Sequence, residues 1–143
     1  MIRSYRELIV WQKSMDLAEK TYLLVSDFPD DERFGLAHQL KKCAVSIPSN
    51  IAEGHTRRST KDYLRFISFA LGSVAEAETQ LLLVVRLGMV APEQTAPLED
   101  LLAEIGKMLR AIQSRLESTE LRDSDTDHFF EEFTDAHPLN PDP

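Results

Sequence analysis

Apolar residues recur at steps of three and four along most of the chain, the spacing that lines one side of an α-helix. Four such stretches predict four helices. The last is the most regular, with Pro97 in its first turn. Its apolar positions step 4-3-4-3-4 through Leu98, Leu102, Ile105, Leu109, Ile112 and Leu116.

The first helix is predicted to open at Ser4, because Ser4 and Glu7 fit a capping box. It ends before Pro29, since the residue that precedes a proline disfavours the helical conformation. Its predicted stripe consists of Tyr5, Leu8, Trp11, Met15, Ala18, Tyr22 and Val25.

The second helix follows Leu36, Leu40, Cys43, Ala44, Ile47 and Ile51. Pro48 lies inside this pattern and predicts a kink, while Gly54 is placed to stop the helix. Ser59 is predicted to cap the third helix and Gly88 to end it. The third stripe consists of Leu64, Ile67, Leu71, Val74, Leu81 and Val85.

Short connections force successive helices to pack antiparallel. We therefore expect an all-α, antiparallel up-and-down four-helix bundle over residues 1–118, with its second helix kinked at Pro48. Residues 119–143 carry Asp and Pro throughout and little periodicity, so we expect an acidic, disordered tail. The apolar cluster of this tail is Phe129, Phe130 and Phe133.

The first and third helices hold more apolar residues than a bundle core needs, and a helix that is apolar nearly all round is buried nearly all round. A monomer would leave this surplus exposed, so the sequence predicts a homo-oligomer. The surplus residues are Ile9, Val10, Leu17, Leu23 and Leu24 in the first helix and Phe66, Phe69, Ala70, Ala77, Leu82, Leu83, Val84 and Leu87 in the third.

Composition adds a compartment to this picture. The chain has one cysteine, Cys43, no signal-peptide core at its start and no long apolar run. We expect a reduced, cytoplasmic protein that spans no membrane. The net charge of −8 resides mostly in residues 119–143, which hold eight Asp or Glu and one Arg, so residues 1–118 are close to neutral.

Basic residues gather between residues 33 and 65, with a local balance of +5. The loop before Ser59 leads into a helix start, which favours an anion. One interpretation is a basic rim that binds nucleic acid, and the other is an ordinary solvated face. The candidates for nucleic-acid binding are Lys41, Lys42, Arg57, Arg58, Lys61 and Arg65.

A polar group surrounds Pro48 and continues on the third helix. Glu78 falls within the third stripe, so we expect a Ser or Asn donor or a neighbour's basic residue to pair with it. No Glu-x-x-His accompanies the carboxylates, so we expect structural pairing and neither a metal nor a cofactor. This structural polar motif consists of Ser46, Ser49, Asn50, Glu53, Glu76 and Glu78.

No catalytic residue is expected. Arg33 and His38 fit a spacing seen in some helical RNA-cleaving domains, a match that is common by chance. The other histidines, His55, His128 and His137, have no partner at ligand or triad spacing. Cys43 has no nearby basic activator and is expected in the core.

Four motifs resemble the bacterial four-helix-bundle proteins named for 23S rRNA intervening sequences. They are Tyr5–Lys13, Phe34–Leu36, Ser46–Gly54 and Gly72–Leu81. The resemblance covers about residues 3–118, and it implies a ring-like homopentamer. The chain is also similar to the accessory protein of diversity-generating retroelements, which implies a reverse-transcriptase-like partner and nucleic acid. The tail departs from the family pattern.

Two functions follow from these features. The first is a non-enzymatic oligomeric scaffold whose basic rim binds RNA, DNA or a protein that handles them. The alternative is a protein-only interaction scaffold that uses exposed helix faces or the acidic tail.

Overall fold

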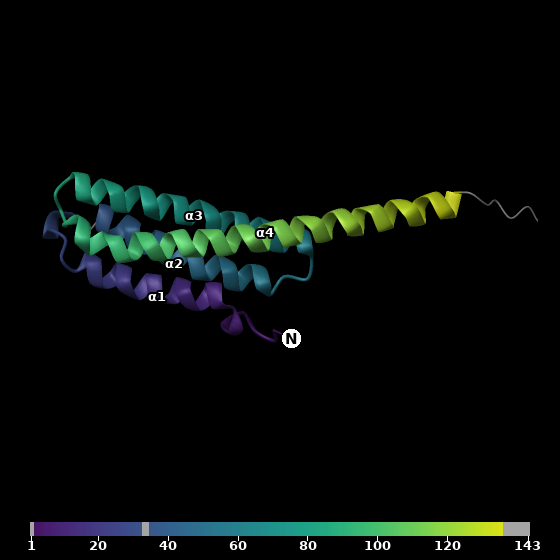
Figure 1. The fold of residues 1–143 in the computed structure, drawn as a ribbon, viewed down its shortest axis with the longest axis horizontal. Coiled ribbons are helices and arrows are strands. Elements are labelled where there is room, and N and C mark those ends of the chain that lie inside the picture. Colours follow the sequence, from purple (N-terminus) through teal and green to yellow (C-terminus); the bar gives the residue numbers. More distant parts are fainter. Residues whose placement is uncertain (1, 33–34, 136–143) are drawn as a thin grey trace, which may run out of the picture.

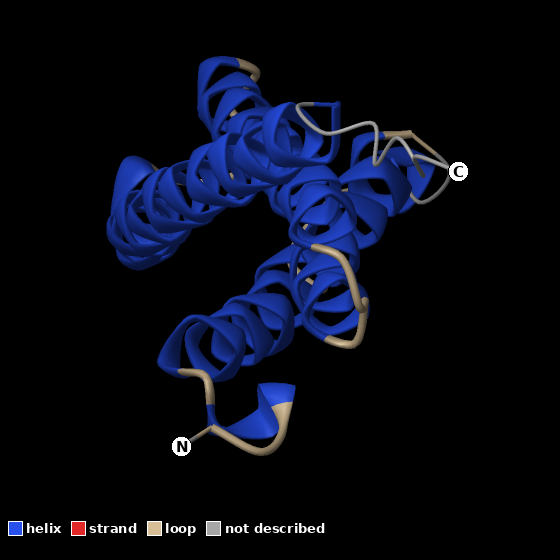
Figure 2. Ribbon diagram, turned by 90° about the vertical axis from the view of Figure 1, so that its right-hand side faces the viewer, coloured by secondary structure: helices blue, strands red, loops and turns tan. Residues whose placement is uncertain are grey.

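The computed structural model describes residues 2–32 and 35–135, with side chains described as far as residue 123. The described chain consists of helices and loops, as Figure 2 shows, and the predicted all-α class is confirmed. Its elements are η1 (Tyr5–Glu7), α1 (Ile9–Val25), η2 (Asp30–Glu32), α2 (Leu36–His55), α3 (Thr60–Arg86) and α4 (Pro92–Asp135).

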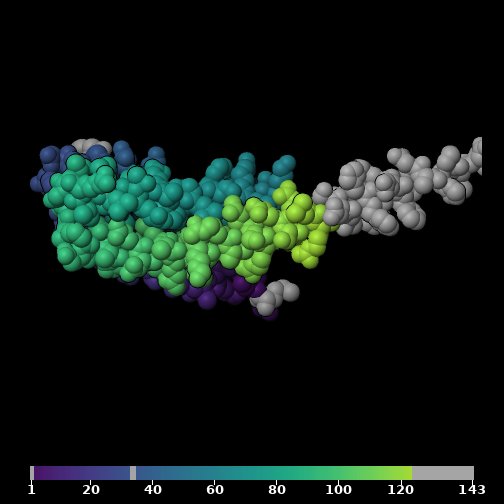
Figure 3. Space-filling view, turned by 45° about the horizontal axis from the view of Figure 1, so that its top comes forward, coloured from purple at the N-terminus to yellow at the C-terminus, as the bar shows by residue number. Residues whose placement is uncertain are grey.

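The four long helices form the predicted up-and-down bundle. Each packs against the next along the chain, and α4 packs against α1 to close it. The α1–α2 and α3–α4 connections lie at one end of the bundle, and the α2–α3 turn lies at the other (Figure 1). In the space-filling view, α4 lies along α3 and continues beyond the α2–α3 end (Figure 3). Antiparallel packing therefore brings the start of α3 close to the middle of α4.

The core takes apolar side chains from all four helices. Of the stripe predicted for the first helix, Leu8, Trp11 and Val25 belong to or pack against the core, but its middle part is wrong. Met15 and Tyr22 are exposed, whereas Leu17 on the opposite side is buried. Two polar residues obscure the true core face, which comprises Val10, Ser14, Leu17, Thr21, Leu24 and Val25. The Ser14 hydroxyl donates to the carbonyl one turn earlier at 2.6 Å, and the Thr21 hydroxyl does the same at 2.7 Å. Both residues therefore enter the core with their hydrogen bonds satisfied.

The chain also starts differently from the expected capping box. Ser4 Oγ accepts from the backbone N–H of Arg6 at 3.2 Å and caps η1. Glu7 accepts from the backbone N–H of Arg3 at 3.0 Å, rather than from Ser4. Leu8 is extended, so α1 begins only at Ile9.

Two glycines act in different ways. Gly88 has a positive φ, in the left-handed region that suits glycine, and it ends α3 as predicted. Gly54 lies inside α2 and does not stop it. A Cβ added to Gly54 would lie 2.8 Å from Phe66 Cβ, so its small size allows α2 and α3 to approach closely at their shared turn.

The fourth helix is longer than predicted at both ends. It begins at Pro92 and contains Pro97 in its second turn. It continues to Asp135, so residues 119–135 are helical where we expected a disordered tail, and residue 118 marks no end of secondary structure. The phenylalanine cluster lies outside the side chains described, and residues 136–143 lie outside the described structure.

Within the described residues, α3 is the one helix long and apolar enough by length and composition to cross a membrane. A helix that supplies a bundle core passes the same test. Here Ile67, Ala70 and Val84 are fully buried by the other helices.

Candidate anion-binding cleft

The six basic candidates lie in two groups along the bundle. Lys41 and Lys42 lie toward the α1–α2 end, where the Lys41 ammonium sits 5.2 Å from the centre of the Tyr22 ring. The other four lie around the α2–α3 turn. From Lys41 to His55 at the end of α2 is roughly 21 Å at about 1.5 Å per residue. The six basic candidates therefore fall into two groups at different heights along α2, and nucleic-acid binding by them stays a prediction.

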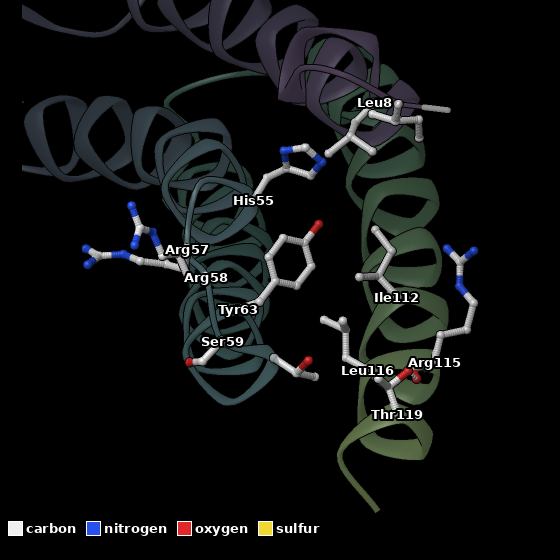
Figure 4. Close-up of a pocket in the computed structure, with 12 residues that line it drawn as sticks. Leu8, His55, Arg57, Arg58, Ser59, Tyr63, Ile112, Arg115, Leu116 and Thr119 are labelled. Atoms are coloured by element: carbon white, nitrogen blue, oxygen red, sulfur yellow. Dashed lines mark hydrogen bonds between the residues drawn. The ribbon is translucent and has the colours of Figure 1, made fainter. Parts of the chain in front are cut away.

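A cleft of about 430 Å³ lies between the α2–α3 turn, α4 and the N-terminal segment. We call this end of the bundle the cleft end. Tyr63 and Ile112 face each other from α3 and α4, whereas three guanidinium groups lie at the outer edges (Figure 4). The cleft thus has an apolar floor and a cationic rim, with no Asp or Glu among its lining residues. They are Ile2, Leu8, His55, Arg57, Arg58, Ser59, Thr60, Tyr63, Ile112, Arg115, Leu116 and Thr119.

The rim arginines differ in whether a neighbouring carboxylate already pairs with them. Arg57 Nη2 lies 2.6 Å from Glu53 Oε1, and its guanidinium stacks over Phe66 at 4.8 Å. Within the described residues, Arg58 and Arg115 form no ion pair. These two arginines therefore offer their full charge to a ligand, on opposite edges of the cleft.

Two more basic candidates lie beside the cleft without lining it. Lys61 is exposed in the first turn of α3. Arg65 lies 3.9 Å from Asp62 and 5.2 Å from the centre of the Phe66 ring, so a neighbouring carboxylate partly offsets its charge. Ser59 caps α3 as predicted, accepting from the Asp62 N–H at 3.1 Å.

The floor contains two rings in edge-to-face contact, His55 and Tyr63, with centres 5.9 Å apart. Burial raises the pKa of the Tyr63 phenol, and the charge of Arg115 partly opposes this shift. Tyr63 is therefore a neutral, flat surface at physiological pH. Aromatic faces beside unpaired arginines suit an anion that carries an apolar or flat group, such as a nucleotide or an acidic peptide with aromatic residues.

The sequence reading missed Arg115, Tyr63 and His55 as members of this site. The available signal was topological rather than local. In an up-and-down bundle the third helix starts at the end where the fourth helix finishes, so Tyr63 and Arg115 are neighbours despite their separation along the chain.

The serines and asparagine around Pro48 serve the helix that contains it. Ser49 donates to the Val45 carbonyl at 2.8 Å, and Asn50 donates to the Ser46 carbonyl at 2.8 Å. Proline supplies no backbone N–H, and these two side chains, which follow Pro48, donate to backbone carbonyls that precede it. Ser46 also donates to the Ser73 hydroxyl, which links α2 to α3.

The prediction that Glu78 is buried is wrong, because Glu78 and Glu76 are both exposed. The polar residue on the buried face is Gln80, 7% exposed, which donates to Glu76 at 3.3 Å. Cys43 is in the core, where its thiol donates to the Ser73 carbonyl at 2.9 Å. Burial, with a smaller effect from Glu76, raises the pKa of Cys43 to about 12, so the thiol stays protonated.

The remaining chemical candidates do not assemble into a site. His38 is exposed, and its suggested partner Arg33 lies outside the described residues. The side chains of His128 and His137 also lie outside them. Across the described part of the chain, no group of three or more His, Cys, Asp or Glu residues is placed to hold a metal ion.

Part of the predicted apolar surplus is exposed and part belongs to the core. On α1, Leu23 of the surplus lines a shallow groove together with Met15, Ala18 and Tyr22, which were predicted for the core stripe, and Glu19. On α3 and its C-cap residue the exposed apolar side chains are Phe69, Leu82, Leu83 and Leu87, each at least 41% exposed. The other surplus residues, Ile9 excepted, are buried: Val10, Leu17, Leu24, Phe66, Ala70, Ala77 and Val84.

Fold and cleft together define a small helical bundle with one open, cationic end. The model of the 23S rRNA-intervening sequence protein family matches residues 6–111, and the chain belongs to this family. A crystal structure from Bacteroides thetaiotaomicron, a protein with unknown function from the S23 ribosomal protein family, is similar. It has 26% identity and a TM-score of 0.67, over 73% of this chain and 98% of that one. No curated protein matches the chain.

Proposed function

We propose that this protein is a non-enzymatic, homo-oligomeric scaffold of the cytoplasm whose cleft end binds nucleic acid or a protein that handles it. The observation that carries the proposal is the cleft rim, where Arg58 and Arg115 have no carboxylate partner among the described residues and no acidic residue lines the cleft. Phosphates favour such cations through a salt-sensitive, sequence-independent attraction.

The oligomeric part of the proposal rests on the exposed apolar residues of α1 and α3. Leu23 is 71% exposed and Leu82 is 58% exposed. Monomers seldom leave large contiguous apolar patches in water. The family resemblance supplies the expected number of five copies. A reverse-transcriptase-like protein is one partner that the resemblance implies.

A protein-only interaction scaffold is the second candidate. The groove beside Met15, Tyr22 and Leu23 favours it, because exposed aromatic and aliphatic side chains are typical anchors for protein partners. In that case the rim arginines would be ordinary solvated charges.

Two measurements on the purified full chain test the proposal. Light scattering should give about five times the chain mass of 16.3 kDa. Fluorescence anisotropy with labelled single-stranded RNA and DNA should show binding at low salt that weakens steeply as salt rises. A monomer at micromolar concentration would refute the scaffold, and absence of binding at low salt would leave the protein-only alternative.

A further inference from the structure

The end of the chain has a chemistry opposite to that of the cleft. Residues 123–135 contain six Asp or Glu and three phenylalanines, and no Lys or Arg. The cleft has three arginines on its rim, no acidic lining residue, and a floor that includes Leu8, Ile112 and Leu116. The acidic residues of the segment are opposite in charge to the rim arginines, and its phenylalanines match the apolar floor. The two surfaces are therefore complementary in charge and in polarity.

The α4 wall of the cleft and the acidic segment are also adjacent in the sequence. The family model matches residues 6–111, so the α4 wall of the cleft, from Ile112 to Thr119, follows the matched range, as does the acidic segment. The α4 wall of the cleft and the acidic segment therefore both lie outside the matched range, whereas the α2–α3 side of the cleft, with Arg57 and Arg58, lies inside it.

A chain cannot place this segment in its own cleft while α4 is helical. Thr119 lines the cleft, and α4 continues from there to Asp135 and away from the bundle (Figure 1). Phe129 lies ten residues beyond Thr119, roughly 15 Å farther along the helix. Residues 136–143 hold one acidic residue and no Phe, Tyr or Trp, so they lack the acidic and aromatic side chains that would suit the cleft.

We propose that the acidic, phenylalanine-containing segment 123–135 of one copy binds in the cleft of a second copy. Because α4 leaves from the cleft end, the receiving copy must face that end, so two copies, or two whole assemblies, meet cleft to cleft and exchange their segments. This goes beyond the proposed nucleic-acid binding and stands without it. Where both hold, the segment competes with nucleic acid for the same arginines.

The test uses a synthetic fluorescein-labelled peptide of residues 119–143 as the probe. Its acceptor is the full chain with Phe129→Ala, Phe130→Ala and Phe133→Ala, which frees the clefts. Circular dichroism first verifies that each acceptor is folded. We expect the peptide to bind, and adding Arg58→Glu and Arg115→Glu should weaken binding about tenfold or more, because two attractions become repulsions.

The matched control adds Lys41→Glu and Lys42→Glu, which makes the same charge change at the other end of the bundle. This control should bind the peptide as the acceptor alone does. No peptide binding, or equal weakening in the control, would overturn the proposal. A peptide that itself carries the three Phe→Ala changes should bind more weakly, and equal binding would show that charge alone is responsible.

Disulfide trapping distinguishes a second copy from the same chain. One preparation carries Thr60→Cys in the cleft and the other Thr134→Cys in the segment. When the mixture is treated with a thiol oxidant such as diamide, the two cysteines should form a disulfide between the two chains. Glu19→Cys in place of Thr60→Cys should not. If instead only a chain with both cysteines reacts, and does so within itself, the second-copy proposal is wrong. None of these readouts involves nucleic acid, so they remain informative if the proposed nucleic-acid binding fails.

Discussion

The two ends of the bundle differ in both charge and closure. The α1–α2 connection carries Asp27, Asp30, Asp31 and Glu32, and Phe28 within it is 8% exposed. The α2–α3 turn at the opposite end carries Arg57 and Arg58 and borders an open cleft. We call the first the acidic end, in contrast to the cleft end.

The difference shows where a small bundle can hold a ligand. The middle of the bundle is filled by side chains such as Ile67, Leu102 and Ile105, each fully buried, so no ligand fits there. At the acidic end Phe28 covers the core. At the cleft end no equivalent side chain among the described residues does so, and the floor stays accessible between unpaired arginines.

Removing the cover of the acidic end should have the largest effect. Phe28→Ala deletes a buried aromatic ring and should lower the free energy of unfolding by about 3–5 kcal/mol. Tyr63→Ala at the cleft end removes a half-buried ring and should lower it by only about 1–2 kcal/mol. Urea denaturation followed by circular dichroism measures both. Equal losses would contradict the distinction between a closed end and an open one.

The close approach of α2 and α3 at the cleft end gives the next prediction. A Cβ at position 54 would press against Phe66, so Gly54→Ala should lower the free energy of unfolding by about 1–3 kcal/mol. Gly72→Ala is the control, because no atom lies within 4 Å of its added Cβ. It should raise stability by about 0.5–1 kcal/mol through helix propensity. A stabilising Gly54→Ala would show that the two helices are not in tight contact there.

The shared interior between the ends should respond to alkali. The folded pKa of Cys43 is about 12, above its ordinary value of 9.0, so the folded state holds a proton that the unfolded state releases. The contribution of the Cys43 proton to the free energy of unfolding is therefore fully present below pH 9. As pH rises from 9 toward 12, this contribution should fall by about 1.4 kcal/mol per pH unit. Melting temperatures at pH 8, 9 and 10 test this. Cys43→Ala should show a shallower decline, and an identical decline would place its origin elsewhere.

The smallest predicted effect concerns Arg57. This arginine lies 2.6 Å from Glu53 in an ion pair. Glu53→Gln releases it and should tighten binding of single-stranded RNA about two- to fivefold at low salt. Because both side chains are about half exposed, at 40% and 50%, stability should change by less than about 0.5 kcal/mol. Fluorescence anisotropy measures the affinity. Weaker binding would mean that Glu53 positions Arg57 for the ligand rather than competing with it.

The four helices of the bundle could be predicted from the sequence, because each signal for a helix acts locally: the apolar spacing, the Ser59 cap and the Gly88 terminator. The core face of α1 could not, since Ser14 and Thr21 look polar in sequence but donate to their own helix backbone when buried. The full length of α4 could not be predicted, because its last part lacks apolar periodicity. Such periodicity marks a helix that packs one face on a core, and it is absent where a helix does not.

The site was predicted only in part for a related reason. Arg57 and Arg58 are neighbours in sequence, and their place at a helix start was visible. Arg115 joins them only because α3 and α4 are antiparallel, a relation that depends on the whole bundle. Lys41 and Lys42 are close to the two arginines in the sequence, but they lie near the start of α2, whereas the arginines follow its end. Because α2 has 20 residues, the two groups are far apart in space.

The salt dependence of nucleic-acid affinity tests the central claim most directly, that the cleft end is the binding end. One variant carries Arg58→Gln, Lys61→Gln and Arg115→Gln, and its matched control carries Lys20→Gln, Lys41→Gln and Lys42→Gln toward the acidic end. With single-stranded RNA, each lost phosphate contact should flatten the log–log slope of affinity against salt by about 0.7. We predict a slope flatter by about two units for the cleft variant and an unchanged slope for the control. Equal slopes in the two variants, or flattening in the control alone, would contradict this account.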